Sequence, residues 1–211
     1  MKKKVSPNRM ELFRLRKRLV LAQRGHKLLK DKLEGLVREV TDLLGEYGAL
    51  RRRLDQAFPR LLARFTLATA VAPQDAVAEA VRQNAAPIEL EIERARIMGV
   101  PVPQFRVPQS AIRDRRFRYS LTQTPPELDI AFEELRKLPG LLFEVARVEK
   151  ALLLLATELE RTRRRTNALE YVLIPELQEN RRDIEQKISE RERSDISRLM
   201  KIKEMIMAER Y

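Results

Sequence analysis

The side chains with the clearest chemical potential in this sequence are one histidine and two runs of three arginines. His26 is the only histidine and cysteine is absent, so thiol catalysis and thiolate metal sites are excluded and a histidine-built metal site is disfavoured. The arginine runs, residues 51–53 and 163–165, are dense enough to contact phosphate groups or acidic protein surfaces. Neither run is interleaved with aromatic residues, which argues against a nucleic-acid site.

The motifs that usually carry catalysis are absent. The sequence has no Gly-x-x-x-x-Gly-Lys-Ser/Thr loop, no Gly-x-Gly-x-x-Gly, no His-Glu-x-x-His and no Gly-x-Ser-x-Gly. Aspartate and glutamate are plentiful, but on solvated helices they are surface charges rather than acid–base pairs. We therefore predict a non-enzymatic chain with no catalytic residue, no cofactor and no bound metal.

The first arm of the chain carries a long heptad pattern. Apolar residues recur at alternating spacings of three and four, which is typical of a left-handed coiled coil. We expect this helix to begin at Ser6-Pro7-Asn8, to tolerate Pro59 and to extend to about Ala85. We call the repeating positions the seam, and in the first arm they are Leu12, Leu15, Leu19, Ala22, His26, Leu29, Leu33, Leu36, Val40, Leu43, Tyr47, Leu50, Leu54, Ala57 and Leu61.

His26 is the one polar side chain in this first-arm series. One interpretation is a metal ligand or a pH-dependent switch. The other is that it specifies the register of the paired helices, as buried polar groups do in coiled coils, and we favour this reading. Two seam threonines of the second arm, Thr162 and Thr166, pose the same choice and receive the same interpretation.

The second arm, after Pro126, repeats the pattern less regularly. We expect a short helix to Leu138, a break at Pro139-Gly140, and then a long helix whose phase Pro175 disturbs. Its seam positions are Val145, Val148, Leu152, Leu155, Leu159, Thr162, Thr166, Leu169 and Leu173, followed more loosely by Leu177, Ile184, Ile188, Leu199, Ile202 and Ile206. Two arms of similar length should fold back antiparallel and bury each other's seam.

The middle of the chain differs in kind. Residues 88–93 alternate apolar and acidic, which predicts a short strand, and residues 104–107 could return as a second strand. Gly99 and the pair Pro101/Pro103 mark the turn. The predicted fold class is therefore mainly α, with two long helices in an antiparallel left-handed coiled coil and a small central β-hairpin. The predicted parts are 1–86 for the basic first arm, 87–126 for the hairpin module and 127–211 for the second arm.

Composition and charge agree with long helices. The chain has 211 residues, 35% of them charged and 5% aromatic, with a net charge of +12. Residues 1–64 hold 18 Lys/Arg against 7 Asp/Glu, whereas residues 127–211 hold 17 against 18. The basic arm could meet phosphate, anionic lipid or an acidic protein surface, or it could simply solvate the helix and complement the other arm. The longest stretch without a charge, residues 65–74, is about half a membrane span, so we expect a soluble cytoplasmic protein.

Two features suggest a partner. Large apolar residues lie off the seam, and in water they favour a further layer or an enclosing sleeve, although a wider seam would also explain them. Four glycines at positions 25, 35, 45 and 48 lie inside the first helix, where each costs about 1 kcal/mol relative to alanine unless another backbone comes close or the helix bends. The off-seam residues are Phe13, Val20, Leu21, Leu28, Leu44, Phe58, Leu153 and Leu154.

Two long motifs resemble the signatures of the D subunit of the V-type (vacuolar and archaeal-type) ATPases, in its prokaryotic form. The first covers residues 7–12 and 19–32, and the second covers residues 162–175. Between them, residues 97–101 resemble the middle module of that family. The resemblance runs in order over residues 5–204. It departs from the family at Asn8, where threonine is more usual, and at Thr166, where valine is common.

The resemblance implies a central rotor shaft, or stalk, of a proton- or sodium-translocating V/A-type ATPase or ATP synthase, which transmits torque between a catalytic hexamer and a membrane ring. The paired termini would enter the hexamer of catalytic and nucleotide-binding subunits. The rest would bind the F subunit of the stalk and the subunit that links the stalk to the proteolipid ring. ATP chemistry would stay in the hexamer, which agrees with the missing phosphate loop.

The same resemblance implies a cytoplasmic chain that is peripheral to the membrane, without membrane insertion and without nucleic acid. The alternative from another class is a nucleic-acid-associated or scaffolding coiled-coil protein, for which the sequence shows no plain reading module. The candidate contacts with the hexamer or another partner are Phe13, Arg14, Lys17, Arg24, Lys27, Arg163, Arg164, Arg165 and Met205.

Overall fold

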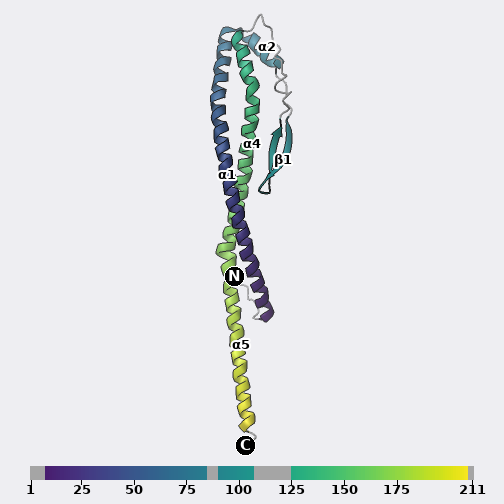
Figure 1. Cartoon of the computed structure of the whole chain (residues 1–211), viewed down its shortest axis with the longest axis vertical. Coiled ribbons are helices and arrows are strands. Elements are labelled where there is room, and N and C mark those ends of the chain that lie inside the picture. The colour runs from purple at the N-terminus through teal and green to yellow at the C-terminus, as the bar shows by residue number, and fades with distance from the viewer. Residues whose placement is uncertain (1–7, 85–89, 107–124, 209–211) are drawn as a thin grey trace. The chain divides into compact units, whose positions relative to one another are not determined.

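The computed structural model describes residues 8–84, 90–106 and 125–208. It divides into two units, which we treat separately: unit 1 comprises Met1–Glu34 with Glu160–Tyr211, and unit 2 comprises Gly35–Leu159. The helices and strands, labelled in Figure 1, are α1 (Arg9–Val71), α2 (Gln74–Asn84), β1 (Glu91–Ile97), β2 (Val100–Arg106), α4 (Pro126–Ala168), the π-helix η1 (Leu169–Leu173) and α5 (Ile174–Ala208).

In unit 1 the beginning of α1 packs antiparallel to α5. Arg9 pairs with Glu192 and Arg16 pairs with Glu185, so partner numbers fall as residue numbers rise. Heptad spacing places one apolar stripe on each helix, and the two stripes face each other. The buried residues of this core are Leu15, Leu19, Ala22, Leu177 and Ile184.

In unit 2 the rest of α1 packs antiparallel to α4, and the two helices run side by side in Figure 1. Glu46 and Arg147 form an ion pair of 2.6 Å between them. The fully buried side chains Leu36, Val148 and Leu155 belong to one continuous apolar core, which extends along α1 to Leu61. Burying such side chains is the main source of stability in a pair of helices.

At the other end of unit 2 a third helix joins the pair. Helix α1 stops at Val71 because Pro73 cannot continue it, and α2 then starts at Gln74. Val77 and Ala80 of α2 are buried with Leu128 and Phe132 of α4. The single helix expected to about Ala85 is therefore two helices, and this expectation was wrong after Val71.

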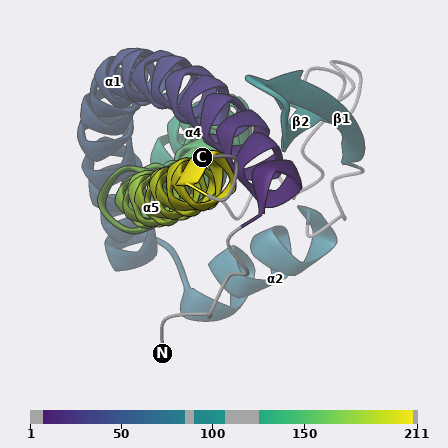
Figure 2. The same ribbon diagram turned by 90° about the horizontal axis from the view of Figure 1, so that it is seen from below.

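Strands β1 and β2 form a two-stranded hairpin (Figure 2). The strands are antiparallel, and Ile97 pairs with Val100 and Ala95 with Val102. Met98 and Gly99 form the turn, with φ of 50° and 81°, as in the type I′ turns that suit the twist of a hairpin. Val100 and Val102 are buried in the main core of unit 2. The hairpin is thus part of that core and not an appendage of it.

Two proline predictions fail for physical reasons. Pro101 and Pro103 lie inside β2 rather than in the turn; they face non-hydrogen-bonded positions of β1, so their missing N–H groups cost no ladder bond. Pro139 lies inside α4, where no break occurs. Its neighbours Leu138 and Leu141 pack on the core, which offsets a local cost of about 3 kcal/mol.

The predicted fold class, mainly α with antiparallel helices and a small hairpin, is confirmed. The helix starts at Arg9, with Asn8 before it, and Pro59 is accommodated inside α1 as expected. Ser6, Pro7, the predicted boundary at 86/87, the first two residues of the strand predicted at 88–93, and residue 107 lie outside the described residues. The strands themselves occupy Glu91–Ile97 and Val100–Arg106.

Candidate functional site

The features of the described residues that could bind a partner are exposed surfaces and one open pocket. No group of three or more His, Asp or Glu side chains within them is arranged to hold a metal ion. None of the described helices combines the length and the apolar character needed to cross a bilayer. One open pocket of about 270 Å³ on unit 2 is lined by Ala57, Arg60, Glu134, Lys137, Leu138 and Leu141, and it is small for a ligand site.

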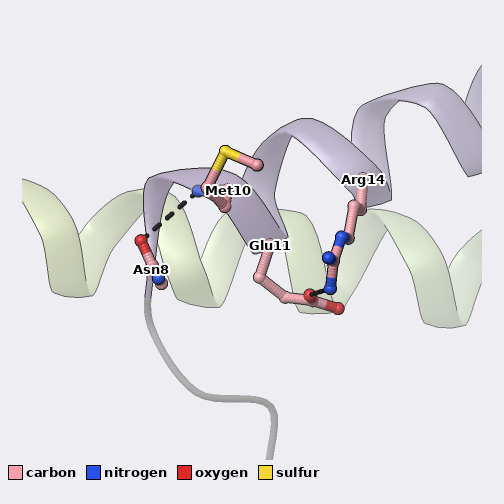
Figure 3. Close-up of polar contacts among 4 residues, drawn as sticks. All are labelled: Asn8, Met10, Glu11 and Arg14. Atoms are coloured by element: carbon pink, nitrogen blue, oxygen red, sulfur yellow. Dashed lines mark hydrogen bonds and ion pairs between the residues drawn. The ribbon is translucent and has the colours of Figure 1, made fainter.

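The N-terminal turn of α1 is capped by a side chain. The Asn8 carboxamide oxygen accepts a 3.4 Å hydrogen bond from the Met10 N–H (Figure 3). The Asn8 carbonyl accepts one from the Leu12 N–H at 3.0 Å. Glu11 lies in the first turn, where an acid suits the helix dipole, and its carboxylate pairs with Arg14 at 3.4 Å. The candidate contact Arg14 is therefore exposed but already partnered within the chain.

Exposed ion pairs connect α1 with α5 in unit 1. The Arg16 guanidinium donates a 2.8 Å hydrogen bond to Glu185 and holds the pKa of that carboxyl below its usual value, with a smaller contribution from the charge of Arg181. Both partners are solvent-exposed, so these pairs are screened and contribute little to stability. The main effect of these ion pairs is to fix which residues of α1 and α5 lie opposite each other.

His26 lies opposite the π-helix. Its Nε2 is 3.3 Å from a carboxylate oxygen of Glu170, and its side chain is 22% exposed. The neighbouring seam threonines are buried, and the Thr166 hydroxyl donates to the Thr162 carbonyl at 3.0 Å. His26 therefore makes a polar contact across unit 1, which is compatible with the register interpretation, and no metal-binding cluster surrounds it within the described residues.

The seam of α1 follows the prediction in its burial. Leu15, Leu19, Leu36, Leu43, Leu50 and Leu54 are buried, whereas Leu12, His26, Leu29, Leu33 and Val40 are half-buried. On the second arm Leu155 is buried, and Leu152, Leu159 and Leu169 are half-buried.

Leu173 is a correction to the predicted seam. It is 36% exposed, and Ile174 packs on the unit 1 core in its place. The π-helix closes its turn with a bond from the Ile174 N–H to the Leu169 carbonyl, five residues back, so it contains one residue more than an α-turn. The seam consequently moves from position 173 to 174 and continues at Leu177 and Ile184.

The predicted partner contacts are all on the surface. Phe13 is exposed, and the Lys17 ammonium lies 4.4 Å from the centre of its ring. Arg24, Lys27, Arg163, Arg165 and Met205 are exposed, and Arg164 is exposed but paired with Glu160. Within this set Lys17 contacts Phe13, whereas Arg14 and Arg164 pair with glutamates outside the set, Glu11 and Glu160.

The predicted seam is wrong on α5 beyond Ile188, because Leu199, Ile202 and Ile206 are exposed rather than buried by the other arm. Beyond Glu192, the partner of Arg9, every described residue of α5 is exposed, including Leu199, Ile202 and Ile206, which the heptad pattern assigns to the continuing stripe. The sequence contained a signal for this exposure, because the apolar stripe of α5 continues past Glu192, which lies opposite the start of α1. The exposed large apolar residues of this segment are Ile196, Leu199, Met200, Ile202, Met205, Ile206 and Met207.

Comparisons with known proteins agree over almost the whole chain. The family of the ATP synthase D subunit matches residues 11–204. The D subunit of a V-type ATP synthase from Clostridium botulinum is 42% identical over 208 residues, covering 98% of this chain and 96% of that protein. The one from Thermoanaerobacter is 40% identical over 203 residues, covering 96% of this chain and 97% of that protein. The chain belongs to the family of ATP synthase D subunits.

Proposed function

We propose that the chain is the central rotor shaft of a V/A-type ion-translocating ATPase or ATP synthase and carries torque between the catalytic hexamer and the membrane ring. The observation that carries this proposal is the exposed apolar stripe of α5 between Ile196 and Met207, which no other described element covers. An apolar surface of this extent favours an enclosing protein partner. A sleeve of catalytic and nucleotide-binding subunits around the termini would supply that partner.

The remaining partners follow from the same proposal. The F subunit of the stalk and the subunit on the proteolipid ring would bind elsewhere along the shaft. The chain would take no part in ATP chemistry, in keeping with the absence of any phosphate-binding loop from the sequence. It would work at the cytoplasmic face of the membrane as a peripheral part of the complex.

The charge of the first arm suits a moving contact. Exposed Arg and Lys side chains of α1, among them Arg24 and Lys27, would face acidic loops of the hexamer through weak, screened interactions. Such contacts re-form at each step of rotation, whereas strong buried ion pairs would hold the shaft in one position.

The absence of native cysteine permits a direct test by cross-linking. A cysteine at Arg14 or Met205, both exposed, is combined with one on the inner wall of the catalytic hexamer. Oxidation should join shaft to hexamer and stop steady-state ATP hydrolysis by the complex, and reduction should restore it. The matched control is a cysteine at exposed Gln104 in the hairpin, which should not form that bond.

Two results would contradict the proposal. Continued multi-turnover hydrolysis with the terminal cross-links formed in high yield would make the chain a static plug or scaffold. Equal cross-linking from position 104 would mean that the termini are not the inserted end.

A further inference from the structure

Gly35 of α1 lies directly beneath the tip of the hairpin. A Cβ atom added to Gly35 would lie 2.4 Å from the Met98 methyl carbon and 3.7 Å from its sulfur, and it would meet no other atom within 4 Å. The missing side chain of Gly35 therefore creates a notch that holds the end of the Met98 side chain. Gly45 of the same helix has nothing within 4 Å of its Cβ position, so the notch is specific to position 35.

Both sides of this contact carry a local conformational cost. Met98 is the one non-glycine residue with positive φ among the described residues, at a turn position where asparagine or glycine is preferred. Gly35 lies in a helix interior, where glycine is the poorest choice apart from proline. Each of these two residues is unfavourable for its local backbone, yet they meet at one point. We take this as a sign that the contact between them is the reason both are present.

The tip half of the hairpin packs on the core of the helices. Ala95, Ile97, Val100 and Val102 pack on the core of unit 2. The opposite half of β1, residues 91–94, is exposed. A two-stranded sheet is only marginally stable by itself, so its position depends on the contacts at the tip.

We propose that Met98 and Gly35 form a latch that holds the tip of the β1–β2 hairpin on helix α1, and that the hairpin moves away from the helices when Met98 leaves the notch. The Met98 side chain is flexible and 42% exposed, so it can withdraw without disturbing the helix pair. The latch is a conformational device of unit 2, and it does not depend on the rotor proposal.

The test measures how often the hairpin opens in the purified full chain. A single cysteine at Val102, buried in the hairpin, reports hairpin opening through its rate of labelling by a thiol reagent. A single cysteine at Val148, buried on α4, reports opening of the helix pair. Each is measured with native Gly35, with Gly35→Ala, and with the matched control Gly45→Ala.

Gly35→Ala should raise the labelling rate at position 102 by about fivefold and leave position 148 unchanged, because the added methyl group displaces only Met98. Gly45→Ala should change neither. Met98→Ala should also raise labelling at position 102, and Gly35→Ala added to it should cause no further increase, since the notch is then empty.

Three results would overturn the latch. These are equal labelling with Gly35→Ala and Gly45→Ala, an increase at position 148 that parallels the one at 102, or additive effects of Gly35→Ala and Met98→Ala. Hydrogen exchange of the hairpin amides in the cysteine-free chain measures the same opening if the Val102→Cys chain does not fold.

Discussion

Replacing Leu36 by alanine tests the register of α1 against its closest internal control, Leu44. Both are leucines of the same helix and the same unit, but Leu36 is 0% exposed in the main core whereas Leu44 is 54% exposed. A buried Leu→Ala change removes apolar contacts and leaves a cavity, which costs about 2–5 kcal/mol. Leu44→Ala should stay within about 0.5 kcal/mol, because alanine is an equally good or better helix former.

The difference is large enough to read by thermal and urea denaturation followed by far-ultraviolet circular dichroism. For a chain of this size, a loss of about 3 kcal/mol lowers Tm by roughly 6–12 °C. We expect that shift for Leu36→Ala and almost none for Leu44→Ala. Equal shifts, or a larger one for Leu44→Ala, would mean that the assigned faces of α1 are wrong.

Three further predictions concern unit 1. Thr166→Val should raise the free energy of unfolding measured in urea by about 0.5–1 kcal/mol. The reason is that the buried Thr166 hydroxyl bonds only the Thr162 carbonyl, which already accepts a backbone bond within the helix. A lower free energy of unfolding would show that the hydroxyl has another role. The lowered pKa of Glu185 means that its pairing with Arg16 stabilises the chain above the usual carboxyl pKa and is lost as the pH falls through the lowered value. Urea midpoints of Glu185→Gln should therefore fall less than those of the native chain on acidification, and parallel curves would refute this. Leu199→Ser should leave the stability of the isolated chain unchanged, because Leu199 is exposed, and a clear loss in the same urea assay would show that α5 is covered.

The seam of α1 could be predicted because its signal is redundant. Fifteen positions repeat one spacing, so no single residue decides the result, and the burial of Leu36 or Leu50 follows from helix geometry alone. The turn of the hairpin is also predicted correctly at Gly99, because few residues adopt a positive φ.

The failures have a common origin in tertiary packing. The sequence suggests a break at Pro139, but the packing of Leu138 and Leu141 maintains α4. The sequence also suggests a turn at Pro101. Whether a proline fits inside a strand depends on whether its missing N–H would face the partner strand, and this depends on the register of the hairpin. Gly35 and Met98 are far apart in the sequence, so no local pattern predicts their contact.

The π-helix has a consequence for how this chain can change by insertion or deletion. The π-helix η1 contains one residue more than an α-turn. The apolar spacing before η1 therefore continues in phase after it only if one residue of η1 is left out. A family member without the π-turn should therefore align with this chain through a single-residue gap between 169 and 173. Pro175 follows directly, and its ring would meet the carbonyl four residues earlier in a regular α-helix. The extra residue and the proline should therefore be gained or lost together, and deletion of one residue here would be tolerated best in a chain that has also lost Pro175.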